Sequence, residues 1–393
     1  MNEADAEDEA EAGKTKEEAL ARSPLGRTTC WLGGKVCGCE CARAKRMRQP
    51  SLFQSLGIAR VTARHAAPGD RLEVYDWFAG AGGFSEGARQ AGCEVVWVCD
   101  NDPLALRTHA VNHPRAEHRL ADLPLPRAEW PFPTDGRPFH THFSPPCQKF
   151  SPLNATNRKP GDSDEAKNLV TWSVETALAS GATSWSLEQV ISKHVVALLE
   201  AVKRRHPGKV EWAALDFAEL GVPQTRNRVI AGPPELVAAL MRRRSKANVR
   251  SARSVIAKPR GTYIRNSKHW VSSSKDARGK ITYVKAGWGD HCFSLDRPAP
   301  TVVAARGLNW ITRTAGGAYL HPRLNQAEYA ALQTFPPTYK WPDTEALAQK
   351  QIGNAVPPLV ATLLLGGTAP PPPRAARPTS PSLLRPPRSY VYR

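Results

Sequence analysis

The sequence predicts an open α/β fold with a mostly parallel sheet, and two observations indicate it. Short apolar segments alternate with helical segments of about ten residues or more between residues 72 and 216. A glycine-rich turn, AGAGG at 79–83, joins the first strand to the first helix, and its glycines let the backbone approach a ligand. In such sheets, ligands bind beyond the carboxyl ends of the strands.

The individual elements follow from their apolar patterns. Strands are expected at 72–78, 93–100, 139–144, 183–189 and 209–216. Helices are expected at 84–91, 103–113, 165–179 and 195–205. The glycine-rich turn, Asp100, the SPPC segment at 144–147 and Glu188 all fall at the ends of expected strands. We therefore expect these groups to meet at one edge of the sheet.

The charge balance predicts a polyanionic partner. The chain has 54 Lys and Arg against 36 Asp and Glu, a net charge of +18, which favours nucleic acid ahead of a membrane surface. No segment approaches the ~20 apolar residues that a membrane span needs. The first twenty residues are acidic and lack the apolar core of a secretory signal. An intracellular protein without a membrane partner is expected.

The eight cysteines show no evenly spaced disulfide framework, which favours a reducing compartment. Four of them lie close together near the N-terminus: Cys30, Cys37, Cys39 and Cys41. Zinc is an alternative for this cluster. However, two successive C-x-C steps fit one tetrahedral ion poorly, and a second pair of ligands is missing, so no metal site is predicted.

The α/β rhythm is lost between about residues 232 and 313. Residues 241–280 contain thirteen Lys or Arg and one acidic residue, with Tyr263 and Trp270 among them. A solvated surface is the alternative interpretation, but so lopsided a run without acidic partners would repel itself. A small basic module that faces a polyphosphate is therefore favoured.

Five short motifs occur in a fixed order along the chain: DWFAGAGG (76–83), PPCQKFS (145–151), EQV (188–190), QTRNR (224–228) and GNAVPP (353–358). Together they resemble the motifs of the DNA (cytosine-5) methyltransferases, over roughly residues 70–366. The resemblance implies a Rossmann-like sheet of the S-adenosylmethionine-dependent methyltransferase type with a small basic target-recognition domain. It also implies methyl transfer to carbon 5 of cytosine in double-stranded DNA.

Cytosine carbon 5 is a poor nucleophile, and the reaction needs a thiolate that adds to carbon 6. Cys147 is the candidate; the alternative, a packed apolar cysteine, is applied to Cys93 and Cys99. Glu188 is expected at the N3 edge of the ring, where negative charge develops. Because the target base lies inside a duplex, it must be flipped out to reach Cys147.

Further roles come from the resemblance. Arg228 would contact the base carbonyl, while Arg226 would support loop or phosphate contacts; two exposed arginines on one strand face are the alternative. Gln148 would steady a mobile loop at 149–165. The motif's usual asparagine, which braces the backbone near the cysteine, is replaced here by Gln189, which puts efficiency in doubt.

The implied cofactor is S-adenosylmethionine. The glycine turn does not match G-x-G-x-x-G, because Ser85 occupies the third glycine position, so a ligand with adenosine but no pyrophosphate fits better. Phe78 would stack near the adenine or sulfonium, Asp100 would bind the ribose, and Asp122 would bind the adenine amine. The full set of expected cofactor residues is Phe78, Ala79, Gly80, Gly82, Gly83, Asp100, Asp102, Asp122, Pro146 and Asn354.

The expected organisation is a leader (1–69), a catalytic domain (70–230), a target-recognition domain (231–320), a return that completes the catalytic domain (321–366) and a Pro- and Arg-rich flexible tail (367–393). A monomer, with a companion restriction endonuclease as a possible partner, is expected. An RNA (tRNA) cytosine-5 methyltransferase remains an alternative. A non-catalytic DNA-binding regulator is less favoured, because Cys147 and Glu188 are both present.

Overall fold

The computed structural model describes residues 30–32, 35–37, 71–146, 162–266, 273–275, 281–283, 292–304, 307–314 and 317–367. Strands β1 (Cys30–Leu32) and β2 (Lys35–Cys37) pair antiparallel in a unit of their own. The remainder of the predicted leader, with Cys39 and Cys41, and the tail beyond Gly367 lie outside the described residues. Within the described part of the chain, no helix is long and apolar enough to cross a membrane, and no cluster of His, Cys, Asp and Glu forms a metal site.

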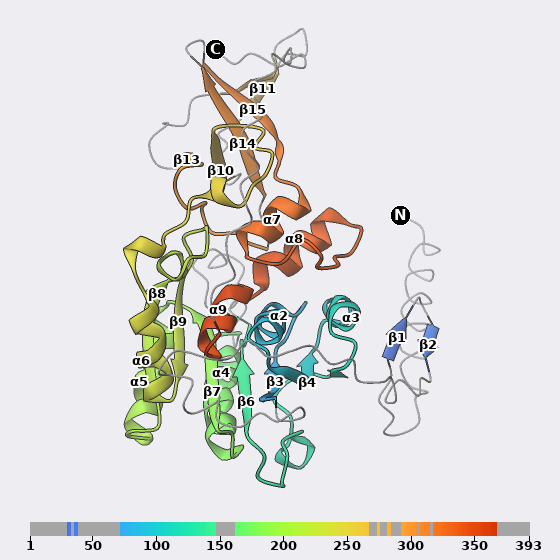
Figure 1. Ribbon diagram of the computed structural model, residues 1–393, viewed down its shortest axis with the longest axis vertical. Helices are drawn as coiled ribbons and strands as arrows, with labels where there is room; N and C mark the ends of the chain where they lie inside the picture. The colour runs from blue at the N-terminus through green and yellow to red at the C-terminus, as the bar shows by residue number, and fades with distance from the viewer. Residues whose placement is uncertain are drawn as a thin grey trace, which may run out of the picture. The chain divides into compact units, whose positions relative to one another are not determined.

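A seven-stranded sheet forms the centre of the second unit, in the order β5-β4-β3-β6-β7-β9-β8 (Figure 1). Its strands are β3 (Glu73–Trp77), β4 (Glu94–Asp100), β5 (Glu117–Leu120), β6 (Phe139–Phe143), β7 (Ser184–Val190), β8 (Glu211–Asp216) and β9 (Asn227–Gly232). The first five strands in this order are parallel, and β9 is antiparallel to both of its neighbours. The predicted open, mostly parallel sheet is confirmed.

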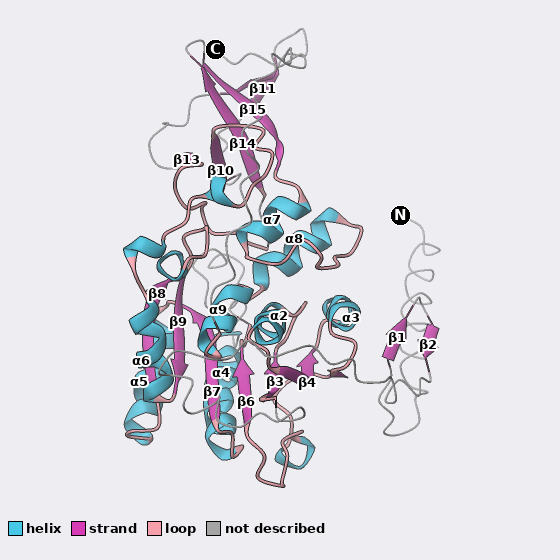
Figure 2. Ribbon diagram, in the orientation of Figure 1, coloured by secondary structure: helices cyan, strands magenta, loops and turns pink. Residues whose placement is uncertain are grey.

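Helices cover both faces of this sheet (Figure 2). One face carries α2 (Gly83–Gln90), α3 (Pro103–Asn112), α6 (Pro234–Arg243) and α9 (Pro358–Leu364), and the other carries α4 (Asp162–Ala179) and α5 (Lys193–Arg205). The core on the second face is rich in aromatic rings. Trp77 is fully buried there, and its Nε1 donates to Thr141 Oγ1 over 3.1 Å.

A second, antiparallel sheet has the order β13-β10-β14-β15. Its strands are β10 (Tyr263–Asn266), β13 (Cys292–Ser294), β14 (Leu308–Thr314) and β15 (Gly317–Arg323), and β11 (Ser273–Lys275) pairs with β12 (Ile281–Tyr283) in a separate hairpin. Its buried residues share one core with α7 (Gln326–Leu332) and α8 (Glu345–Asn354). We call this sheet, with the segment that leads into it from residue 244, the small lobe.

The last helix packs unusually closely on the first helix of the large sheet. A Cβ at Gly83 would lie 2.2 Å from the Val356 carbonyl oxygen, and one at Gly87 would lie 2.2 Å from the Pro358 carbonyl oxygen. Only glycine fits at these two positions, so the GFSEG sequence of α2 is what allows α9 to lie against it. The C-terminal return therefore completes a layer that begins far earlier in the chain.

Candidate active site

The strand ends bring the motifs together. Because β3, β4, β6 and β7 are parallel, the residues that follow them lie at one edge of the sheet. β9 runs in the opposite direction, so its first residues lie at the same edge. This arrangement gathers Phe78, Asp100, Ser144, Glu188 and Arg228, which come from five different parts of the sequence.

Asp100 anchors the glycine-rich turn. Its Oδ2 accepts a hydrogen bond from the Gly80 backbone N–H at 2.8 Å, and its Oδ1 accepts one from the Asp102 N–H at 2.8 Å. Burial raises the pKa of Asp100, and these two hydrogen bonds oppose the rise. Phe78 and Gly80 both have positive φ, 59° and 53°, so the turn bends sharply where β3 ends.

In the structure, Asp102 caps a helix and pairs with a lysine. Its Oδ1 accepts from the backbone N–H groups of Leu104 and Ala105 and caps α3, while its Oδ2 pairs with Lys350 Nζ at 2.9 Å. Partial burial would raise the pKa of Asp102, but the Lys350 ammonium and the cap hydrogen bonds lower it overall. Asp102 is thus a capping residue that also ties α3 to α8.

Asp122 lies two residues beyond the end of β5, the strand next to the one that ends with Asp100. Asn101 Nδ2 donates to Asp122 Oδ1 over 3.0 Å, which fixes one carboxylate oxygen of this exposed side chain. Since β5 and β4 are adjacent and parallel, the two acids lie at neighbouring strand ends. Asn101 had no signal in the motifs, because its partner is twenty-one residues away in the sequence.

Glu188 and Arg228 form an ion pair, with 2.9 Å between Arg228 Nε and Glu188 Oε1. Their side chains are only 11% and 13% exposed, respectively. The antiparallel register explains the contact, since Arg228 lies opposite Val190 on β7, two residues beyond Glu188. A carboxylate and a guanidinium are therefore held together at the edge where the strand ends meet.

Gln189 braces the segment that leads to Cys147. Its Nε2 donates to the Pro145 carbonyl over 3.0 Å, and its Oε1 accepts from the Val190 N–H at 2.7 Å. The glutamine is fully buried, so the extra methylene is accommodated without loss of this contact. Pro146 is exposed at the end of the segment, whereas Cys147, Gln148 and most of the 149–165 loop lie outside the described residues.

Arg226 contacts the backbone of neighbouring segments, which is one of its two expected roles, and its burial rules out the other, a phosphate contact. It is 2% exposed, and its guanidinium donates to the backbone carbonyls of Val302, Gly353 and Ala355 over 3.1–3.4 Å. It lies just before β9 rather than beside Arg228 on an exposed strand face. A side chain that is buried in this way cannot contact phosphate; it joins the large sheet to the small lobe and the C-terminal return.

Other residues of the same motif make comparable connections that the sequence did not reveal. Gln224 Nε2 donates to the Leu332 carbonyl at 2.8 Å, and its Oε1 accepts from the Val302 N–H at 2.9 Å. The Thr301 hydroxyl donates to the Thr225 carbonyl at 2.6 Å. Asn354, at the end of α8, is exposed.

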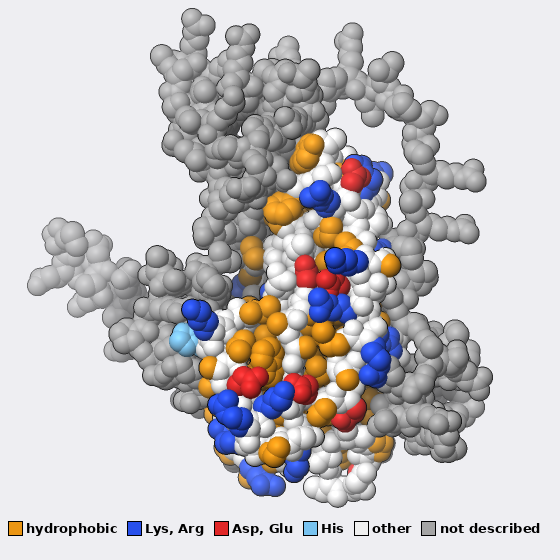
Figure 3. All heavy atoms as spheres, turned by 90° about the vertical axis from the view of Figure 1, so that its left-hand side faces the viewer, with side chains coloured by type: hydrophobic (Ala, Val, Ile, Leu, Met, Phe, Trp, Pro, Cys, Tyr) orange, Lys and Arg blue, Asp and Glu red, His pale blue; other side chains and the backbone are white. Residues whose placement is uncertain are grey.

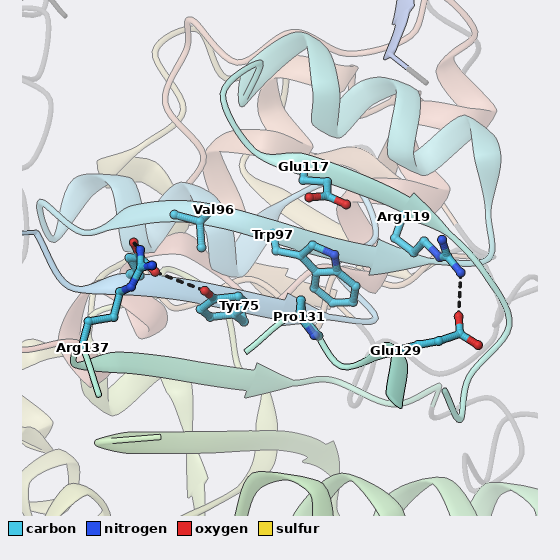
Figure 4. Close-up of a pocket in the computed structure, with 9 residues that line it drawn as sticks. Tyr75, Val96, Trp97, Glu117, Arg119, Glu129, Pro131 and Arg137 are labelled. Atoms are coloured by element: carbon cyan, nitrogen blue, oxygen red, sulfur yellow. Dashed lines mark hydrogen bonds and ion pairs between the residues drawn. The ribbon is translucent and has the colours of Figure 1, made fainter. Parts of the chain in front are cut away.

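A pocket of about 560 Å³ lies elsewhere on the sheet (Figure 4). It is lined by residues of β3, β4 and β5 and by the segment before β6, and an ion pair between Arg119 and Glu129 crosses its rim. None of the predicted site residues lines it. The strand-end constellation, not this pocket, is therefore the candidate active site.

The basic run is less lopsided in space than in sequence. Three of its arginines form ion pairs with acids from outside the run: Arg244 with Glu219, Arg253 with Asp296, and Arg260 with Glu328. Seen from the side of β8, basic side chains of the described surface are scattered and lie beside acidic ones (Figure 3). The expectation that this run lacks acidic partners is wrong for its described part.

Known proteins are similar to the chain in both sequence and fold. The sequence profile of the C-5 cytosine-specific DNA methylases matches residues 72–178 and 238–367. Type II methyltransferase M.HgiDI from Herpetosiphon aurantiacus is 28% identical over 309 residues, which are 75% of this chain and 93% of that protein. Type II methyltransferase M.HindV from Haemophilus influenzae is 25% identical over 300 residues, 73% of this chain and 92% of that protein.

The fold agrees with these sequence matches. The crystal structure of S. pombe Dnmt2 methyltransferase superimposes with a TM-score of 0.52 at 16% identity, covering 75% of this chain and 98% of that one. The segments that the profile matches include the glycine-rich turn, Asp100 and the C-terminal return with Asn354. The chain therefore belongs to the C-5 cytosine-specific DNA methylase family and is a DNA (cytosine-5) methyltransferase.

Proposed function

We propose that the chain methylates carbon 5 of a flipped-out cytosine in double-stranded DNA through a transient covalent bond to Cys147. One observation carries the proposal: the Glu188–Arg228 ion pair lies beside the Pro145 segment, which Gln189 holds two residues before Cys147. A carboxyl group, a guanidinium and the prolines that precede the candidate nucleophile thus come from three motifs to one edge of the sheet.

The chemistry assigns a role to each group. The Cys147 thiolate adds to ring carbon 6, and the electron pair of the 5,6 double bond becomes available at carbon 5. Glu188 stabilises the charge at N3 by donating a proton or hydrogen bond there, and Arg228 at the ring carbonyl favours the same charge. After methylation, loss of the proton from carbon 5 expels the thiolate and restores the aromatic ring.

S-adenosylmethionine, when bound, supplies the electrophilic methyl group. The residues at the β3 and β4 ends fit this ligand: Asp100 can accept from ribose hydroxyls, and Phe78 presents a partly buried ring. A Cβ at Gly80 would meet no atom within 4 Å, so there is open space beside the turn. We assign the methionine part to the Gly80–Gly82 backbone and the adenine amine to Asp122.

The organisation follows from the same proposal. Residues 70–243 and 324–366 form the catalytic domain, because α6 packs on the large sheet, and the small lobe (244–323) contacts the target sequence. The enzyme acts as a monomer, and the Type II names of its relatives support a companion restriction endonuclease.

Covalent trapping tests the proposal. Bisulfite sequencing of DNA from cells that express the protein identifies the methylated site, and duplexes carrying 5-fluorocytosine at that site are then incubated with the protein and S-adenosylmethionine. We expect an adduct that survives denaturing electrophoresis, and none with Cys147→Ser. A Cys147→Ser protein that methylates at the normal rate would refute the mechanism, and transfer of labelled methyl to tRNA but not to DNA would refute the substrate.

A further inference from the structure

Tyr339, in the segment between α7 and α8, contacts the glycine-rich turn (79–83) from a distant part of the sequence. We call this turn the cofactor turn, after the ligand proposed to bind there. It is 7% exposed, and its hydroxyl donates to the Ala81 carbonyl. The Gly82 carbonyl lies 3.4 Å from the same hydroxyl oxygen. No motif predicted a contact between residues 258 positions apart.

Gly82 lies directly against the Tyr339 hydroxyl. Gly82 has a φ of +94°, and a Cβ there would lie 2.6 Å from the Tyr339 hydroxyl oxygen and 2.9 Å from His109 Cδ2. Tyr339 and His109 therefore occupy the space that a side chain would need. The Ala81–Gly82 peptide is enclosed on this side by two rings.

A hydrogen-bonded chain holds the residues that follow the turn. Ser85 Oγ donates to Asp76 Oδ2 at 2.7 Å, His109 Nε2 is 2.9 Å from Ser85 Oγ, and His109 Nδ1 is 3.0 Å from His118 Nε2. Because Ser85 Oγ donates to Asp76, it must accept from His109 Nε2. His109 Nδ1 then accepts from His118 Nε2, so the donors run in one direction from His118 to Asp76. The first turn of α2 is thus fixed independently, and Tyr339 acts on the peptide just before it.

The ring of Tyr339 belongs to the core of the small lobe. It packs against Phe335 and Trp341, with ring centroids 4.7 and 4.9 Å away. The same core includes Trp310 and Ile264 from the antiparallel sheet. Tyr339 is therefore the point at which this core makes a hydrogen bond to the cofactor turn.

We propose that Tyr339 is a positioning residue for methyl transfer: its hydroxyl fixes the Ala81–Gly82 peptide in the orientation that receives the methionine part of S-adenosylmethionine. The inference rests on the proposed binding of that cofactor at Gly80–Gly82. Tyr339 acts through the turn and need not touch the cofactor itself.

The test is Tyr339→Phe in the full chain, because this change removes the hydroxyl and keeps the ring. We expect the Kd for S-adenosylmethionine, measured by titration calorimetry, to rise about 5- to 50-fold, since a buried carbonyl loses its donor. The KM for S-adenosylmethionine should rise in parallel, while kcat at saturating cofactor changes less than about threefold.

Two matched tyrosines serve as controls. Tyr75 is buried within β3, where its hydroxyl donates to Glu73, and Tyr329 contacts the Leu308 backbone within the small-lobe core. Tyr75→Phe and Tyr329→Phe should leave the cofactor Kd within about twofold of wild type. Equal weakening by Tyr329→Phe would indicate general loosening of the core and overturn the proposal.

The outcomes separate this inference from the function on which it rests. If the wild-type protein fails to bind S-adenosylmethionine, the proposed cofactor is wrong. If wild type binds it and Tyr339→Phe, shown to be folded by thermal unfolding and circular dichroism, binds it within about twofold of wild type, only the positioning role is wrong.

Discussion

The large sheet and the small lobe use their charged residues in opposite ways. In the large sheet, Glu188 and Arg228 meet at the strand ends, where the fold places ligands. Where the chain leads into the small lobe, Arg244, Arg253 and Arg260 fold back onto acidic side chains. Charge counted along the sequence thus overstates the unpaired positive charge in the described part of this run, whereas the strand ends bring together charged residues that lie far apart in the sequence.

The largest expected effect tests the large-sheet side of this contrast. Glu188→Gln keeps the shape of the side chain and removes its acid function, so methyl transfer should fall by about 10²- to 10⁴-fold. The rate of labelled methyl transfer to the cognate duplex in a single turnover measures this decrease. Glu211→Gln on β8, where the carboxylate pairs with Lys203, is the matched control and should remain active. Full activity of Glu188→Gln would contradict the proposed acid function of Glu188 at the strand ends.

The two arginines of QTRNR should separate stability from catalysis. Arg226→Met leaves the Val302 and Gly353 carbonyls without the donor shown for them, while Ala355 keeps Gln333, and should lower the free energy of unfolding by about 3–5 kcal/mol. Arg228→Met should cost less stability, about 1–2 kcal/mol, but reduce the transfer rate at least about tenfold. Urea unfolding measures the loss of stability in both variants, and single-turnover assays measure their methyl-transfer rates. The reverse ranking in stability would show that Arg226 is not the structural member of the pair.

Acid should destabilise the protein through buried histidines of the large sheet. Burial lowers the pKa of His140 to about 3 and of His113 and His118 to about 4, so the folded state keeps them neutral. Below about pH 6.5 the unfolded chain takes up these protons first, so stability is present above that pH and lost as pH falls towards 4.

Two carboxyl groups oppose this trend. Burial raises the pKa of Asp76 to about 7 and also raises the pKa of Asp100, so the folded state binds their protons more tightly, and acid favours folding at these sites. The histidines outnumber these two carboxyl groups. We expect urea unfolding to show a loss of at least about 3 kcal/mol between about pH 6.5 and pH 5, given roughly 1.4 kcal/mol per pH unit for each site. A flat profile over this range would contradict the buried neutral state.

The smallest effect is expected at the paired arginines. Arg253→Ala and Arg260→Ala remove cations that already contact Asp296 and Glu328, so DNA affinity should fall less than about threefold. Lys246→Ala and Lys258→Ala, at exposed positions of the same run, are the comparison. If these lysines bind phosphate, each change should reduce the slope of log affinity against log salt by about one. A larger loss of DNA affinity from the arginine changes than from the lysine changes would show that the paired arginines also bind DNA.

The sequence predicted the buried strands of the large sheet to within one or two residues at most ends, because apolar runs identify them. It missed β5, whose EHRL sequence is polar because it is an edge strand, and it gave no sign that β9 runs antiparallel. It singled out Asp100, Glu188 and Arg228, since strand ends and motifs coincide there, and the structure places all three at one edge of the sheet. It could not give the roles of Arg226, Asp102 or Tyr339, because their partners lie up to 258 residues away.

Because α9 fits closely on α2, the packing of α2 can be completed only after the C-terminal residues have been synthesised. The glycine face of α2 is complete by Gln90, but the backbone that covers it comes from residues 356–361. A nascent chain interrupted before that point carries every catalytic motif except the last and still lacks its closing layer. Premature release therefore yields an unfinished core rather than a smaller working enzyme.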